Sequence, residues 1–193
     1  MQFDPLYYKD RIRVVNPAGD VGIVTLWSPV ATVEKKLNLI EPALLDAGKS
    51  RVAVVANLYG DGMLAMFCNL HFNPQIKHII AMGQDMGLPT CDEVKAFLEH
   101  GVEDDEVLGR PIKRVKGTKR LLDLPPDFDV GFLQRNLDFV ALGQLSDAGF
   151  AQRLREVFAS LPPPVAVAES ERREVRMKEP SASDFTYLPS DPL

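Results

Sequence analysis

Three short, nearly continuous apolar runs constrain the fold of this chain more than any other feature. They span residues 21–27, 51–56 and 77–82 and are rich in Val and Ile. Such runs are typical of central strands that are covered on both faces of a sheet. Helical patterns of apolar residues lie between and after these runs, at 63–70 and 92–100. The alternation of strands and helices predicts an α/β fold with a mainly parallel central sheet.

The second helical segment carries start and stop signals. Thr90 and Glu93 have the spacing of a capping box, and Pro89 directly precedes Thr90. Gly101 is suited to the C-terminal end of the helix. We therefore expect this helix to begin with a side-chain cap and to end at His100.

The remaining elements complete one domain. Residues 137–142 predict a fourth strand. An amphipathic helix is expected to begin at Ser146 and to end before the prolines at 162–164, with an apolar face made of Phe150, Leu154, Val157, Phe158 and Leu161. A chain of 193 residues has the length of a single domain, so we assign residues 1–161 to one α/β domain.

Residues 162–193 differ in composition from the rest of the chain. They hold six of the 15 prolines and little periodic apolar content. Such a segment cannot bury enough apolar surface to offset the entropy of ordering, so it is predicted to be a disordered tail. The alternative is that Phe185, Tyr187 and Leu188 form a short anchor that docks on the domain.

Charge and composition disfavour several classes of partner. The net charge of −5 and the pI of about 5.2 argue against binding to nucleic acid or to an anionic membrane. No apolar run approaches the roughly 18 residues of a membrane-spanning helix, and the first ten residues do not resemble a leader peptide. These observations predict a soluble, cytoplasmic protein.

Metal binding and nucleophilic catalysis have little support. Cys68 and Cys91 lack the spacing of a zinc or redox motif and are expected to be buried apolar residues. The three histidines, His71, His78 and His100, are scattered and have no partner at metal-ligand spacing. We therefore predict no metal site.

The segments that follow the three strong strands are the expected binding site. Ligands of open parallel sheets bind outside the carboxyl ends of the strands. Glycines allow a close approach of the backbone, and the first turn of a helix favours an anion. The predicted ligand-binding residues of these segments are Trp27, Ser28, Asn57, Tyr59, Gly60, Asp61, Gly62, Gly83, Gln84, Asp85, Gly87 and Thr90.

Some of these residues can also be explained by a purely structural role. Gly60, Asp61 and Gly62 are equally consistent with a turn and an N-cap. Asp61 and Asp85 are the candidate catalytic residues, although no neighbouring acid can be identified for Asp85 and no catalytic role is assigned to it. Neither a Walker A loop nor Gly-x-Gly-x-x-Gly is present.

The basic run 110–120 holds six cations in eleven residues. A solvated face is one interpretation. The functional interpretation is that Gly117, Thr118 and Lys119 form a polar loop near the edge of the sheet, which receives a phosphate or a carboxylate.

Several of these segments resemble a known family. Asn73-Pro74-x-Ile76 followed by an apolar strand and Gly83 is the most specific of them, and the similarity extends over about residues 18–145. Here the chain resembles the A subunit of tetrahydromethanopterin S-methyltransferase, a corrinoid-carrying protein. The resemblance implies a Rossmann-like three-layer sandwich that binds a cobamide at the carboxyl ends of the strands. In the family a histidine in the loop after the third strand ligates cobalt, but residues 83–90 contain none, so a corrinoid is not expected here.

The resemblance also implies a small-molecule ligand of the one-carbon or methyl-transfer type. Relatives of the family are described as thymidylate-synthase-like or pteroate-related, which suggests a pterin, a folate or a nucleotide. Our first hypothesis is therefore a small-molecule-binding or group-transfer protein. The alternatives are a thymidylate-synthase-like enzyme acting on a pyrimidine nucleotide, and a non-catalytic subunit with a protein partner or in a homo-oligomer.

Overall fold

The computed structural model describes residues 1–59 and 62–178. Its main sheet has the strand order β1-β3-β2-β4-β8. Strands β2, β3, β4 and β8 are parallel, and β1 at the edge is antiparallel to β3. The predicted α/β class with a mainly parallel sheet is confirmed, and the four parallel strands arise from the four apolar runs. The strands are β1 (Ile12–Val14), β2 (Val21–Val24), β3 (Val52–Ala56), β4 (His78–Ala81) and β8 (Asp138–Ala141).

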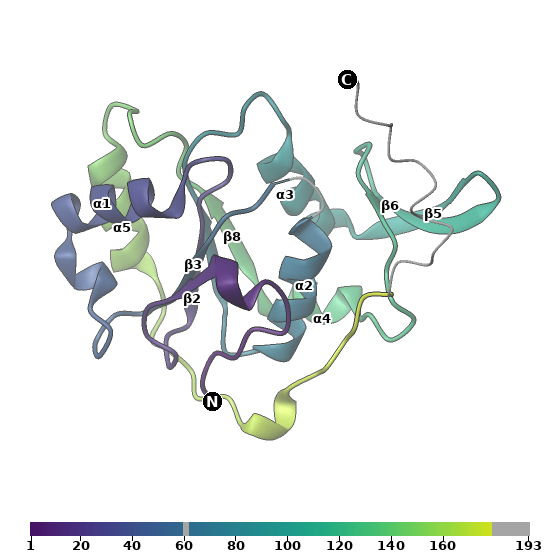
Figure 1. The fold of residues 1–193 in the computed structure, drawn as a ribbon, viewed down its shortest axis with the longest axis horizontal. Coiled ribbons are helices and arrows are strands. Elements are labelled where there is room, and N and C mark those ends of the chain that lie inside the picture. The colour runs from purple at the N-terminus through teal and green to yellow at the C-terminus, as the bar shows by residue number, and fades with distance from the viewer. Residues whose placement is uncertain (60–61, 179–193) are drawn as a thin grey trace, which may run out of the picture.

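Helices cover the two faces of this sheet (Figure 1). On one face, α1 (Val30–Ile40) and α5 (Phe150–Ser160) bury Val33, Leu37 and Leu154 against residues of β2, β3 and β4. The opposite face carries a second core, in which Phe67 and Phe97 stack with their ring centroids 4.1 Å apart. The helices of that face are α2 (Gly62–Phe72), α3 (Thr90–His100) and α4 (Val130–Asn136).

The basic run 110–120 belongs to a second, smaller sheet. Strands β5 (Val102–Val107), β6 (Arg110–Val115) and β7 (Leu121–Leu122) form an antiparallel sheet. Leu108 and Gly109 both have positive φ, as a tight hairpin turn requires. The acidic side chains of β5 face the basic side chains of β6, as in the ion pair between Asp104 and Lys113 at 2.5 Å. The acidic residues 103–106 and the basic residues that follow them from residue 110 are therefore cross-strand partners in a hairpin.

Two helix starts differ from the prediction. The N-cap of α3 is Pro89, the Thr90 hydroxyl is buried without a described partner, and Glu93 instead forms an ion pair with Arg120 at 2.7 Å. The predicted capping box is therefore wrong, because a distant arginine holds the glutamate. Gly101, with φ of 70°, does end α3 as expected. Helix α5 begins at Phe150 rather than at Ser146, because Gly149 before it is left-handed.

Part of the segment that was predicted to be disordered packs on the domain. Val167 and Val175 are buried, and residues 169–171 form a 3₁₀ turn. Residues 167–178, which the sequence predicts to be disordered, thus contact the domain through apolar and arginine side chains in this structure. The predicted anchor residues Phe185, Tyr187 and Leu188 lie outside the described residues. Among the described residues no helix is both long enough and apolar enough to cross a membrane.

Candidate functional site

A cavity of ≈ 270 Å³ lies on the α2 face of the main sheet. Its floor comes from β2, β3 and β4, and one wall is α2. The opposite wall is the N-terminal segment, residues 1–12. The lining residues used below are Tyr8, Arg11, Ile12, Gly22, Val24, Val54, Ala56, Asn57, Tyr59, Gly62, Met66, Asn69, Leu70 and Ile79.

Gly22 in the middle of β2 shapes the cavity floor. A Cβ at this position would lie 2.8 Å from the Cδ1 of Ile79, and a larger side chain would extend further over the floor. Gly22 is also a lining residue. A glycine inside a strand weakens the strand and often marks a close approach of another group. Here it leaves the side chain of Ile79 in place and the adjacent space open.

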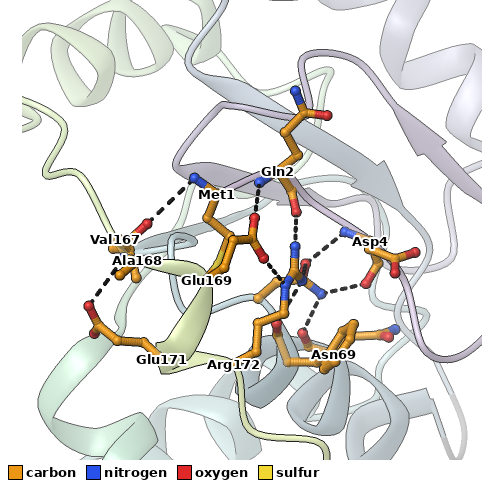
Figure 2. A network of polar contacts seen from close by, with 11 residues as sticks. Met1, Gln2, Asp4, Asn69, Val167, Ala168, Glu169, Glu171 and Arg172 are labelled. Carbon is orange, nitrogen blue, oxygen red and sulfur yellow. Dashed lines mark hydrogen bonds and ion pairs between the residues drawn. The ribbon is translucent and has the colours of Figure 1, made fainter.

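Two buried asparagines at the end of α2, one inside the helix and one just after it, hold the N-terminal wall in position. The Oδ1 of Asn69 accepts the backbone N–H of Leu6 at 2.7 Å and that of Tyr7 at 3.0 Å. Asn73, just after the helix, exchanges two hydrogen bonds with the backbone of Asp4, at 2.8 and 2.9 Å. Amide side chains can replace a partner strand in this way because each has both a donor and an acceptor. Figure 2 shows Asn69 and Asp4 within this network.

Residues 167–177 fasten the same wall from outside. The Arg172 guanidinium donates to the carbonyl of Phe72 at 3.0 Å, to Oδ1 of Asn73 at 3.1 Å and to the carbonyl of Gln2. Glu169 accepts from Arg172 at 2.6 Å, and this hydrogen bond is the main cause that lowers the pKa of the Glu169 carboxyl below its ordinary value. The cluster in Figure 2 thus joins both ends of the described chain to the end of α2.

The loops after the strands are bonded mainly to one another. The Nδ2 of Asn57 donates to Oγ1 of Thr25 at 2.8 Å and to the carbonyl of Ser28 at 2.7 Å. The backbone N–H of Gln84 donates to Oγ of Ser28, and the N–H of Trp27 donates to the carbonyl of Gln84, both at 2.9 Å. The three loops therefore lie together at the carboxyl ends of the strands, where the sequence predicts the binding site. Their polar groups, however, stabilise the loops themselves.

Gly83 is required where two of these loops cross. Its φ is +108°, and a Cβ there would lie 2.6 Å from the carbonyl oxygen of Thr25. Both the left-handed conformation and this contact exclude a side chain. The glycine therefore serves the close packing of the two loops.

Trp27 and Tyr59 form an aromatic pair at this edge of the sheet. Their ring centroids are 4.6 Å apart, and the planes are inclined by 28°. Both side chains are exposed, with 40% and 42% of their surface accessible. Tyr59 also lines the cavity, so the pair stands at its margin.

The predicted residues of the third loop lie apart from the cavity lining. Asp85 has one buried carboxylate oxygen without a partner among the described residues, and its other oxygen accepts weakly from the N–H of Cys91 at 3.5 Å. Burial, followed by the charges of Asp85 and Asp92, raises the pKa of the Cys91 thiol to about 11. Cys91 is therefore a neutral thiol and a poor nucleophile at pH 7. Gly87, with φ of 75°, has open space around it.

The structure brings together only some of the predicted site residues. Asn57, Tyr59 and Gly62 line the cavity, and Trp27 joins them through its stack on Tyr59. Ser28, Gln84 and Gly83 support the loops. Thr90 is the first residue of α3, and Asp85 contacts the N–H of Cys91 in that helix. Gly117, Thr118 and Lys119 belong to the turn between β6 and β7 of the second sheet, and anion binding by this loop stays a prediction. Gly60 and Asp61 lie outside the described residues.

No group of three or more potential metal-ligating side chains exists among the described residues. His78 contacts Asp138 at 3.2 Å, and His71 lies against the rings of Phe128 and Phe132. Burial lowers the pKa of His71 to about 4, and neither of its nitrogens has a partner among the described residues. The loop after β4 contains no histidine, and His71 and His78 belong to α2 and β4, so the residues present do not fit a histidine-ligated corrinoid.

The N-terminal wall was missed by the sequence analysis. Tyr8, Arg11 and Ile12 line the cavity, yet no periodicity marks their segment as part of a site. Two signals point toward it. Gly22 interrupts an apolar strand, and Asn69 and Asn73 lie four residues apart in an otherwise apolar segment, which indicates that buried amides bind a neighbouring backbone.

A comparison with protein-family models finds no match, and a comparison with curated proteins finds none either.

Proposed function

We propose that this chain is a small-molecule-binding protein of the carrier or group-transfer type, and that its ligand occupies the cavity between the N-terminal segment, β2, β3 and α2. The observation that carries the proposal is the cavity itself, which begins at Asn57 and Tyr59 beside the carboxyl ends of the strands. Ligand pockets of α/β proteins are mostly apolar, with few polar groups, and lie at this edge of the sheet. The helices on both faces support a Rossmann-like three-layer arrangement.

The strand order favours this position over the neighbouring crevice. In the parallel strands, the chain moves from β2 outward to β3 and then returns to β4 on the other side of β2. The switch point between β2 and β4 is the usual ligand crevice of such sheets. Here the bonds between Trp27, Ser28 and Gln84 bridge it. A ligand is therefore accommodated beside the switch point, on the β3 side.

Pterins and pyrimidine nucleotides are the first ligands to test. Their flat rings can pack beside Tyr59, and their ring N–H groups can donate to Oδ1 of Asn57, which has no hydrogen bond to the described residues. The resemblance to the methyl-transfer family supports the same ligand class. A thymidylate-synthase-like reaction gains no support from the geometry, because Asp85 does not line the cavity.

Native mass spectrometry tests the proposal on protein purified from its own host. Wild-type protein should carry one small molecule that is released on denaturation. Ala56→Leu, which adds bulk to the cavity lining, should be folded and empty. Ala141→Leu is the matched control, since it makes the same change at the equivalent end of β8, outside the lining. An equal load in the Ala56→Leu variant, or an empty wild type that also binds neither tetrahydrofolate nor dUMP in solution, would refute the proposal.

A further inference from the structure

The charge of the cavity lining differs from the charge of the whole chain. The chain carries a net charge of −5, yet Arg11 is the one charged side chain among the lining residues in the described ranges 1–59 and 62–178. A cation at the margin of an apolar cavity attracts an anionic group of a ligand. The cavity is therefore electrostatically selective even though the surface as a whole is acidic.

Arg11 also differs from its basic neighbours in the sequence. Lys9 lies 3.8 Å from a carboxylate oxygen of Asp4, and Arg13 lies 3.3 Å from one of Glu34. Arg11 has no carboxylate partner within the part of the chain that the structure describes. Its guanidinium instead lies 5.7 Å from the centroid of the Tyr8 ring. An arginine held against a ring keeps its five N–H donors available for an anion.

The backbone fixes this pair at the cavity. Tyr8 adopts a left-handed conformation with φ of 57°, and the N–H of Arg11 donates to the carbonyl of Tyr8 at 2.8 Å. The turn between them leads directly into β1, which pairs with β3 in the cavity floor. The bonds from Asn69 to residues 6 and 7 hold the other side of the turn. The guanidinium is thus attached to a wall that is anchored on both sides.

The rest of the lining defines the body of the ligand. Ile12, Val24, Val54, Met66, Leu70 and Ile79 present apolar side chains. The amide of Asn69 is already bonded to the N-terminal backbone, which leaves few polar groups for a highly polar ligand. Burial of apolar area supplies the affinity of such a site, and a single charged contact fixes the orientation.

We propose that the cavity binds an organic anion with an apolar body, and that Arg11 binds the anionic group at the margin. This inference rests on the proposed function and narrows its ligand class. It favours a ligand whose rings or chain enter the cavity while a carboxylate, sulfonate or phosphate stays at Arg11.

Two fluorescent probes with the same aromatic body test the inference on the full chain. 1-Anilinonaphthalene-8-sulfonate carries an anionic group, and N-phenyl-1-naphthylamine lacks it. Arg11→Gln should weaken binding of the sulfonate about tenfold, as expected for the loss of one charge-assisted hydrogen bond, and should leave the neutral probe unchanged. Arg11→Lys should retain most of the sulfonate affinity because the charge remains. Arg13→Gln is the matched control and should change neither affinity.

The outcomes separate this inference from the proposed function. If Ala56→Leu abolishes binding of both probes but Arg11→Gln affects both equally or neither, the cavity binds ligands and the role of Arg11 is wrong. If Ala56→Leu leaves both affinities intact, the probes bind elsewhere and the proposed function fails as well. Thermal melting of each variant checks that the fold is retained.

Discussion

The two faces of the main sheet are covered in different ways. Helices α1 and α5 cover one face, and the buried residues of that face, such as Leu37 and Leu154, have no accessible surface. On the other face α2 covers part of the sheet, and the irregular N-terminal segment covers the area beside it, leaving a cavity of ≈ 270 Å³. A regular helix fills the surface of a sheet with interdigitating side chains, whereas an extended segment held by two asparagines leaves space. The cavity is therefore a result of how the second face is covered.

The largest expected effect contrasts the two faces with one matched substitution. Leu37→Ala on the closed face should lower the free energy of unfolding by about 3–4 kcal/mol, because it creates a new cavity in a packed core. Leu70→Ala borders the existing cavity and should cost only about 2 kcal/mol, since its side chain loses fewer contacts. Urea denaturation measures both values. Equal losses would show that the two faces are packed alike.

The second prediction concerns His71 beneath α4. Burial lowers its pKa from 6.5 to about 4, so between these values the unfolded chain binds a proton that the folded chain does not. Stability should therefore fall as the pH decreases from 6.5 to 4, by up to about 3 kcal/mol. His71→Phe keeps a ring in the aromatic cluster and lacks this titration. The difference in stability between variant and wild type should grow in favour of the variant as the pH falls, and a constant difference would contradict the assignment.

A smaller effect is expected where the C-terminal segment holds the N-terminal wall. Arg172→Ala removes hydrogen bonds to Phe72, Asn73 and Gln2 and should cost about 1–2 kcal/mol. Arg176→Ala removes only an exposed pair with Glu174 and should change stability by less than about 0.5 kcal/mol. Thermal unfolding of both variants checks the contrast. Similar losses would mean that the segment adds no specific support to the wall.

The smallest effect is expected at the aromatic pair. Trp27→Ala removes a stack on Tyr59 in which both rings are exposed, and should lower stability by about 0.5–1 kcal/mol. Because Trp27 stacks on Tyr59, a shift of Tyr59 in this variant should also lower the affinity for a ligand that carries a ring. A large loss of stability, measured by denaturation, would instead show that the indole is part of the core.

The parallel strands were predictable because their signal is local. A run such as residues 52–56 has apolar side chains on both faces of the strand. This pattern is typical of a central strand that is covered on both sides. The edge strand β1 and the N-terminal wall carry no such signal. Their position depends on contacts over long stretches of chain, such as the hydrogen bonds from Leu6 and Tyr7 to Asn69.

Local rules also failed where a distant group competes for a side chain. Glu93 fits a capping box, but Arg120 from the second sheet binds its carboxylate. Asn57 fits a ligand-binding amide, but its Nδ2 is used to join two loops. The sequence therefore points to the edge of the sheet beside which the cavity lies, and the long-range packing decides which side chains remain available there.

The most direct test of the cavity as the binding site is a map of backbone NMR shifts during titration with the anionic naphthalene probe. We expect the shift changes to concentrate around the cavity, at Gly22, Asn57, Met66 and Asn69, with few changes on α1 and α5. Shift changes that gather instead on α1 and α5 or on the β5–β7 sheet would contradict the account.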